Sequence, residues 1–241
     1  MTDMVSLPAY QVSSPVRPEV VVFDVVETLA SLDAVATRLR ELQQPEGLLA
    51  RWFTRLLRDG MALTAAGSYA GFAEVAASAL RAETRRALSD EQIGHAVAGF
   101  AELTPQPDAV PALRAAQRAG FRVFTLSNGA APSTRKFLER AGVADLVERV
   151  LSIDDVQAWK PVPAPYEYAV RAAGVSAERI ALVAVHSWDV HGAHHAGLTT
   201  GWCPRLEGEQ TPVFAPADIT ADTLYGVIAG LAALGSPSTG E

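Results

Sequence analysis

The sequence predicts an α/β protein in which a doubly wound parallel sheet carries an all-helical insertion after its first strand. Short apolar runs rich in β-branched residues, such as Val20–Phe23 and Ile180–Val185, are typical of strands buried on both faces. Beyond residue 105 such runs alternate with segments of helical length, which favours right-handed crossovers and a parallel sheet. Between Thr37 and Leu103 there is no convincing strand, and apolar residues recur at helical spacing.

The individual elements follow from the same pattern, in chain order. After the strand at 20–23 comes a helical region that Gly60 and the pair Gly67-Ser68 are expected to break. The apolar positions of that region are Leu39, Leu42, Leu48, Leu49, Trp52, Phe53, Leu56 and Leu57. A further helix is expected at about 71–87, and Ser89-Asp90-Glu91 is typical of the start of the next one. Later strands are expected at 121–126, 147–153, 180–185 and 199–203, and helices at 109–119, 132–141, 163–173, 191–196 and 221–234.

This order of elements predicts two structural units and two tails. Residues 18–33 and 105–235 are expected to form an α/β core domain, and residues 34–104 a helical cap domain. Residues 1–17 contain prolines and no continuous apolar segment, so a mobile tail is expected there and not a signal peptide. Residues 236–241 are expected to form a frayed C-terminus.

Composition limits the classes of function. Hydrophobic residues make up 49% of the 241 residues and charged residues 20%, which is typical of a soluble globular protein. The net charge of −7 argues against a nucleic-acid surface and against an anionic membrane as partner. No apolar stretch is long enough for a membrane span. The single cysteine, Cys203, excludes an intrachain disulfide and fits a reducing compartment, so we expect a cytoplasmic protein.

Four short segments follow predicted strands in a fixed order. They are Phe23–Thr28, Leu126–Gly129, Trp159–Pro161 and Ser187–Asp189. Because the carboxyl ends of parallel strands lie along one edge of a sheet, the four segments are expected to converge on a single pocket. A lone aspartate at a strand end is often a helix cap, and a lone Ser-Asn-Gly is a common turn. The order of the four segments, together with their placement after predicted strands, favours a functional site.

The residue types in these segments suggest roles. Asp24 follows the first strand directly, and the Thr28 hydroxyl can turn back toward the same loop. Ser127 and Asn128 can donate hydrogen bonds to an anionic substrate. Lys160 supplies a cation that would hold two acidic groups near one another. The second acid, at position 189, fits as a partner of that lysine or as a base.

The four segments resemble the motifs of the haloacid dehalogenase superfamily, which are a strand ending in Asp-x-x-Gly-Thr, a Ser/Thr-Asn strand end, a Lys-Pro and an acidic loop. The resemblance covers roughly residues 18–205 and implies a Rossmann-like core, with a cap where the helical insertion lies. It also implies that Asp24 is a nucleophile, with Thr28, Lys160 and Asp189 as the other catalytic residues.

Two branches of this superfamily are distinguished by what the segments lack. By the resemblance, phosphatases carry a proton-donating aspartate two positions after the nucleophile, where this sequence has Val26. The first aspartate of the phosphatase acidic loop falls on Ala184, so a Mg²⁺ ligand is missing. A halide leaves without a proton, and displacement at carbon needs no metal. We therefore expect no metal and no cofactor, with Mg²⁺ needed only under the phosphatase alternative.

Positive signs point to the 2-haloacid dehalogenase (type II) branch. The run Ser187–Ala193 is similar to its Trp-Asp-x-x-Gly-Ala segment, and Tyr166 matches a tyrosine that follows the lysine. The resemblance implies hydrolytic dehalogenation of a small 2-haloalkanoic acid to the 2-hydroxy acid. In this reaction Asp24 forms an ester with the halogen-bearing carbon, and water activated by Asp189 hydrolyses it. The residues expected to bind substrate are Ser127, Asn128, Tyr166, His186 and Trp188.

Three positions depart from the dehalogenase pattern. Glu27 stands in place of a glycine, Ala184 in place of a serine and His186 in place of an asparagine. A buried Glu27 would raise the pKa of Asp24 by like-charge repulsion, whereas an outward Glu27, which we favour, is only a loop residue. His186 either lines the halide or carboxylate site or caps a strand end. The departures leave a catalytically weak binding protein of the same fold as a further alternative.

Arginines of the helical insertion and histidines after Asp189 are further candidates for binding an anion or a metal. Dehalogenases of this branch bind halide with a cap arginine, and of the three arginines on the expected cap helix, including Arg58, we favour Arg51 or Arg55. His191 with His194 or His195 has the spacing of metal ligands on a helix, but the glycines and alanines between and after them favour close packing instead. The resemblance also implies a homodimer formed through the cap.

Overall fold

The computed structural model describes residues 15–235 and places a six-stranded sheet at the centre of the α/β unit. The strand order is β5-β4-β1-β6-β7-β8, and every neighbouring pair is parallel. The strands are β1 (Val20–Phe23), β4 (Arg122–Ser127), β5 (Arg149–Ser152), β6 (Ile180–Ala184), β7 (Thr199–Trp202) and β8 (Ile219–Thr220). The chain runs outward from β1 in one direction and returns to β6 on its other side, so the predicted doubly wound α/β fold is confirmed.

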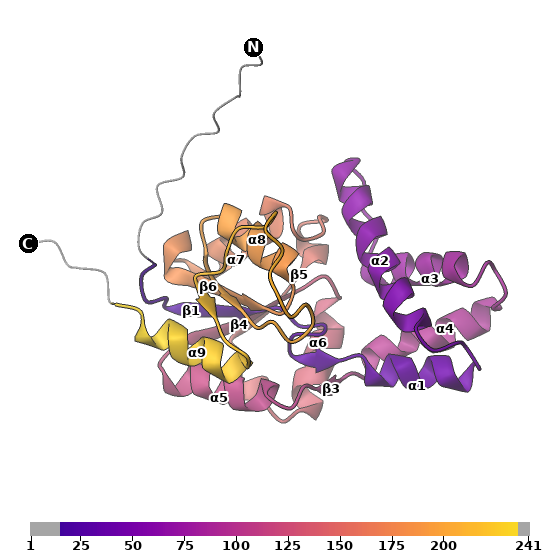
Figure 1. The fold of residues 1–241 in the computed structure, drawn as a ribbon, viewed down its shortest axis with the longest axis horizontal. Helices are drawn as coiled ribbons and strands as arrows, with labels where there is room; N and C mark the ends of the chain where they lie inside the picture. The colour runs from indigo at the N-terminus through magenta and orange to yellow at the C-terminus, as the bar shows by residue number, and fades with distance from the viewer. Residues whose placement is uncertain (1–14, 236–241) are drawn as a thin grey trace, which may run out of the picture.

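Helices cover both faces of this sheet (Figure 1). Strand side chains alternate between two cores: Val21 and Phe23 belong to one, and Val20 and Val22 belong to the other. All four are fully buried, as expected for a central strand in a doubly covered sheet. The first core contains α5 (Ala109–Arg118), α6 (Ala131–Arg140) and α9 (Leu224–Ala233), and the second contains α7 (Pro163–Ala173) and α8 (Ser187–His195).

A helical insertion lies to one side of the sheet, at the right of Figure 1. It consists of α1 (Asp33–Glu41), α2 (Leu48–Ala65), α3 (Phe72–Glu83), α4 (Asp90–Ala98) and the short 3₁₀ helix η1 (Gly99–Ala101). Its centre is built around Trp52, whose indole N–H donates to Ala76 O at 2.8 Å and whose ring meets Phe100 edge-on. Two short antiparallel strands, β2 (Ala30–Ser31) and β3 (Thr104–Pro105), connect the insertion to the sheet unit.

The remaining short helices lie in the connections of the sheet unit. They are η2 (Ala144–Leu146), η3 (Ile153–Asp155) and η4 (Ala177–Arg179).

The observed strands and helix α8 differ in part from the predicted elements. The strands β2, β3 and β8 were not predicted, because two residues are too short to show alternation. Helix α8 begins at Ser187 instead of His191, so Asp189 lies in its first turn.

Gly60 does not break the helix in which it lies. The position is inside α2, and a Cβ atom there would come within 2.3 Å of the Trp159 ring. The glycine therefore permits close contact between α2 and the loop that carries Trp159, which also donates its backbone N–H to Thr64 Oγ1 at 2.9 Å. Through these contacts with α2, Trp159 connects the loop that precedes Lys160 to the helical insertion.

Parts of the predicted tails lie outside the described residues, namely 1–14 and 236–241. Arg17, placed in the expected tail, is bound to the sheet unit: its N–H donates to Gly235 O at 2.9 Å and its guanidinium lies over the Phe121 ring. Over residues 15–235, the structure contains no helix with the length and apolar character needed to cross a bilayer.

Candidate active site

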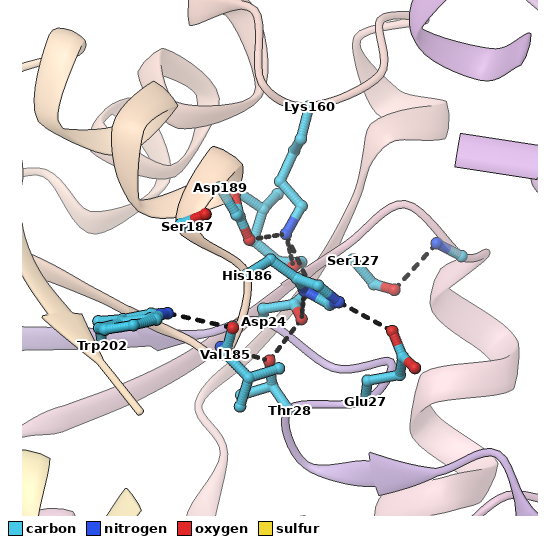
Figure 2. Close-up of polar contacts among 12 residues, drawn as sticks. Asp24, Glu27, Thr28, Ser127, Lys160, Val185, His186, Ser187, Asp189 and Trp202 are labelled. Atoms are coloured by element: carbon cyan, nitrogen blue, oxygen red, sulfur yellow. Dashed lines mark hydrogen bonds and ion pairs between the residues drawn. The ribbon is translucent and has the colours of Figure 1, made fainter. Parts of the chain in front are cut away.

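Polar side chains from four parts of the chain meet at the carboxyl edge of the sheet (Figure 2). Asp24 follows β1, Ser127 ends β4, Lys160 lies in the loop before α7, and Asp189 lies in the first turn of α8 after β6. The structure therefore brings together the residues that the motif order predicted would share one pocket.

The Lys160 ammonium connects the two aspartates. Its Nζ donates to Asp24 Oδ1 at 2.8 Å, to Asp189 Oδ2 at 2.6 Å and to Leu126 O at 3.1 Å, so all three of its protons have acceptors. Lys160 is fully buried. Burial alone would lower its pKa, but the two carboxylates, Asp189 first, outweigh burial and raise it. The lysine is therefore a permanent cation in this site.

Asp24 is held in its ionised form. Burial by itself would raise the pKa of Asp24, yet the charges of Lys160 and then His186 hold it well below its usual range. Its other oxygen, Oδ2, accepts a hydrogen bond of 2.6 Å from the Thr28 hydroxyl, which in turn accepts the Val185 N–H at 3.2 Å. Asp24 thus presents a fixed carboxylate anion at the end of β1.

Arg205 fixes the loop after Asp24, although no sequence pattern pointed to it. Its Nη2 donates to Thr28 O at 2.7 Å and to Glu27 O at 3.3 Å, and its Nη1 binds Asp108 at 2.7 Å. The residue lies in the irregular segment after β7. Because it binds backbone carbonyl groups, only the fold reveals its role.

Asp189 is enclosed by donors. Tyr166 donates its hydroxyl to Asp189 Oδ1 at 2.6 Å, while Lys160 occupies Oδ2. Burial raises the pKa of Tyr166, so the phenol stays protonated. Burial also raises the pKa of Asp189, and the like charge of Asp24 adds to this against the pull of Lys160. Asp189 is fully buried, so the expected base has both oxygens occupied and no exposed surface.

The Ser127-Asn128 segment has two distinct contacts. Ser127 Oγ accepts the Gly129 N–H at 2.9 Å, which leaves the hydroxyl proton of Ser127 free to be donated. Asn128 Oδ1 instead accepts the backbone N–H of Lys160 at 3.1 Å, so Asn128 positions the lysine loop. Ser127 and Gly129 border a cavity of 530 Å³ whose other walls are mainly apolar and include Phe72 of α3.

His186 and Glu27 form a second polar pair beside Asp24 (Figure 2). His186 Nε2 lies 2.9 Å from Glu27 Oε2, and His186 Nδ1 lies 3.4 Å from Asp24 Oδ2. Burial would lower the pKa of His186, but the two carboxylates raise it to about 9. The Trp188 ring stacks on the imidazole with centroids 5.0 Å apart. The favoured expectation of an outward Glu27 was wrong, because its carboxylate points into the site.

The backbone at Glu27 has a conformation that glycine, the residue of the dehalogenase pattern, adopts without strain. Its φ is +65°, in the left-handed region that a side chain makes unfavourable by ~1–3 kcal/mol. This chain carries a glutamate at a position where glycine would be unstrained, and the carboxylate reaches His186.

The expected halide-binding arginines lie elsewhere. Arg55 and Arg51 both pair with Glu83 of α3, and Arg51 is mostly exposed. The structure therefore does not bring Arg51 or Arg55 to Asp24, because their shared face of α2 packs toward α3. Arg40 and Arg58, by contrast, line a cavity of 1360 Å³ whose core side is formed by Glu27, His186, Trp188 and Leu206. Within residues 15–235, the cations that pair with Asp24 are Lys160 and His186.

The histidines of α8, a helix that begins after His186, have ring contacts with one another. His191 Nδ1 accepts the Ala215 N–H at 3.0 Å, and the His191 ring contacts the His195 ring edge-on. In the described part of the chain, no three His, Cys, Asp or Glu side chains are grouped in a way that could hold a metal ion.

Comparison with known proteins agrees with this architecture. Residues 18–197 match the haloacid dehalogenase-like hydrolase family. The haloacetate dehalogenase H-2 of Moraxella sp. (strain B) is 30% identical over 206 residues, which cover 81% of this chain and 92% of that protein. The (S)-2-haloacid dehalogenase of Pseudomonas sp. (strain YL) is 29% identical over 210 residues, covering 80% and 87%.

A solved structure gives the same result. The L-2-haloacid dehalogenase RSc1362 superposes with a TM-score of 0.84 at 30% sequence identity, over 90% of this chain and 99% of that one. Similarity of sequence and of fold over most of the length means that this chain belongs to the haloacid dehalogenase-like hydrolases.

Proposed function

We propose that the protein hydrolyses the carbon–halogen bond of a small 2-haloalkanoic acid and releases the 2-hydroxy acid. The observation that carries the proposal is an ionised Asp24 carboxylate fixed by Lys160, next to a Val26 that has no proton to give. A halide leaves as a stable anion, so this arrangement suits displacement at carbon better than expulsion of an alkoxide. The dehalogenase names of the relatives support the same reaction.

In the first step, an oxygen of Asp24 attacks the carbon that bears the halogen. The carbon–halogen bond breaks with its electron pair on the halide, and an ester forms between Asp24 and the substrate carbon. Lys160 keeps the aspartate ionised before the attack, and Thr28 fixes the orientation of the carboxylate through Oδ2. In the second step, water adds to Cγ of Asp24, and the ester separates into the 2-hydroxy acid and free aspartate.

The substrate would lie across the entrance to the 530 Å³ cavity. The free hydroxyl proton of Ser127 is placed to bind the substrate carboxylate. The apolar wall, to which Phe72, Phe100 and Phe137 contribute, suits the alkyl part of the substrate. Because this wall combines side chains of the sheet unit and of the helical insertion, we infer that the insertion serves as a cap that excludes water during displacement.

We propose that the reaction runs without a metal, because the donor set does not fit Mg²⁺. Val26 and Ala184 provide no side-chain oxygen, and the Lys160 ammonium already lies between Asp24 and Asp189, the two carboxylates that a cation would share. The lysine supplies the positive charge that the two acids require.

The proposal is tested by incubating the protein with chloroacetate or 2-chloropropionate, with and without EDTA, and separately with p-nitrophenyl phosphate and Mg²⁺. We expect halide release that EDTA does not change, and none from Asp24→Asn. Phosphate release that EDTA abolishes would favour the phosphatase alternative. No reaction over a broad panel of haloacids and phosphate esters would favour a binding protein.

A further inference from the structure

We propose that His186, positioned by Glu27, is the base that activates water for hydrolysis of the Asp24 ester. The inference rests on the proposed function, since it concerns the second half of that reaction. It gives a role to two residues that stand where the dehalogenase pattern has asparagine and glycine.

The imidazole of His186 lies between a carboxylate, Glu27, and the proposed nucleophile, Asp24, and pairs with each through a different ring nitrogen. Glu27 Oε2 binds His186 Nε2 at 2.9 Å, which directs the other ring nitrogen, Nδ1, toward Asp24. Nδ1 is buried and makes no hydrogen bond within the described residues, although it lies 3.4 Å from Asp24 Oδ2. Nδ1 therefore pairs with Asp24 through charge but lacks a well-formed hydrogen bond, which leaves it able to bind a closer partner such as water. A water that attacks Cγ of Asp24 would pass within reach of Nδ1.

Asp189 is less suited to this task. Both of its oxygens accept short hydrogen bonds of 2.6 Å, one from Tyr166 and one from Lys160, and the residue has no exposed surface. His186, in contrast, borders the 1360 Å³ cavity, so its imidazole adjoins space that can hold water even though Nδ1 itself is buried. We therefore assign Asp189 to holding Lys160 in place, and His186 to the water.

The backbone at Glu27 supports a functional role for its side chain. A glutamate with φ of +65° is strained, and glycine would relieve that strain. Arg205 adds to the support by binding the carbonyl oxygens of Glu27 and Thr28, which fixes the loop in this conformation. The strained loop and its bound guanidinium aim the Glu27 carboxylate at His186.

The charge on Asp24 controls when His186 can act as a base. In the resting enzyme, Asp24 and Glu27 both raise the pKa of His186, so the imidazole is protonated. Ester formation removes the charge of Asp24, so that within residues 15–235 Glu27 is the carboxylate that still pairs with the ring. The pKa of His186 then falls, and the proton can leave at the stage of the reaction that needs a base.

Other charged groups face His186 from the elements packed around it. Glu207 accepts the Ser187 N–H next to it, and Lys160 lies on the far side of Asp24. Across the cavity, the charged side chains are Asp33, Arg40, Glu46 and Arg58 of the helical insertion. None of these groups changes charge when the ester forms. Asp24 is therefore the group that shifts the protonation equilibrium of His186.

The protons balance over one turnover. After halide departs, the His186 imidazolium releases its proton to solvent. Neutral His186 then takes a proton from the water whose oxygen bonds to Cγ of Asp24. The tetrahedral intermediate expels the substrate alkoxide, which receives that proton from His186 and leaves as the 2-hydroxy acid. The carboxylic acid left on Asp24 gives its proton to His186, which restores the resting pair. One water is consumed, and one halide and one proton are released.

The test follows the covalent ester directly. Wild-type protein, His186→Gln and Glu27→Gln are mixed with excess chloroacetate and quenched in acid at increasing times. Halide is measured in parallel with the intact mass of the protein, and a peptide map locates any carboxymethyl group. His195→Gln is the matched control, because His195 is an exposed histidine at the C-terminal end of α8, the helix that His186 precedes.

We expect His186→Gln to release one equivalent of halide at close to the wild-type rate and then to stall with a carboxymethyl group on Asp24. Loss of a general base predicts hydrolysis slower by roughly 10²–10⁴-fold. Glu27→Gln should accumulate the same ester to a lesser extent, and His195→Gln should behave as wild type. In the wild type, hydrolysis of the ester should accelerate as pH rises through the lowered pKa of His186, and in His186→Gln this acceleration should be absent.

Two results would overturn the inference. One is His186→Gln turning over without accumulating ester. The other is His186→Gln losing the initial halide release as well, which would assign His186 to the first step. A wild-type protein that releases no halide and carries no adduct from any haloacid would instead refute the proposed function itself.

Discussion

Replacement of His186 should change how the stability of the fold depends on pH. In the folded protein Asp24 and Glu27 outweigh the effect of burial and raise the pKa of His186 from 6.5 to about 9. A group whose pKa is raised by folding adds stability that is fully present below its unfolded pKa and is lost as pH rises through its folded pKa. At about 1.4 kcal/mol per pH unit, the shift corresponds to about 3 kcal/mol.

The assay is chemical denaturation of the wild type and of His186→Gln at a series of pH values between about 6 and about 10. Other groups titrate over this range in both proteins, so the difference between the two free energies of unfolding isolates the histidine. We expect the wild type to lose about 3 kcal/mol relative to the variant as pH rises. Parallel curves for the two proteins would show that folding does not raise the pKa of His186 and would refute the charge assignment.

Two further predictions concern the packing around the site. Lys160→Met should lower the free energy of unfolding by roughly 3–5 kcal/mol in denaturant titrations, because it leaves two buried carboxylates without their cation. A decrease in the free energy of unfolding no larger than that for replacing an exposed lysine would contradict the pairing of Lys160 with the two carboxylates. Gly192→Ala should cost ~1–3 kcal/mol and reduce halide release, because its Cβ would lie 2.5 Å from the Tyr166 hydroxyl that holds Asp189. Gly94→Ala, where nothing lies within 4 Å, is its control and should leave activity unchanged.

The sheet and its polar edge could be predicted because their signals are local in the sequence. The central strands β1 and β6 are short, fully buried apolar runs, and each polar segment comes at or after the end of a predicted strand. Since parallel strands end at one edge, order and placement alone brought Asp24, Lys160 and Asp189 together.

Features that depend on orientation could not be predicted in this way. Arg51 and Arg55 were on the expected helix, but which face of α2 packs against α3 depends on tertiary contacts with Glu83. The inward direction of Glu27 depends on a positive φ that the sequence does not reveal for a residue other than glycine. Arg205 acts through backbone carbonyl groups, which any arginine in any loop could bind.

The central claim is that Asp24 forms an ester with the substrate and that water attacks the aspartate, not the substrate carbon. It is tested most directly by a single turnover in water enriched in heavy oxygen, with enzyme in excess over 2-chloropropionate. We predict that the label enters the carboxylate of Asp24 and is absent from the hydroxyl group of the product. Label in the product hydroxyl and none in the peptide that carries Asp24 would contradict the claim, because water would then have displaced the halide directly.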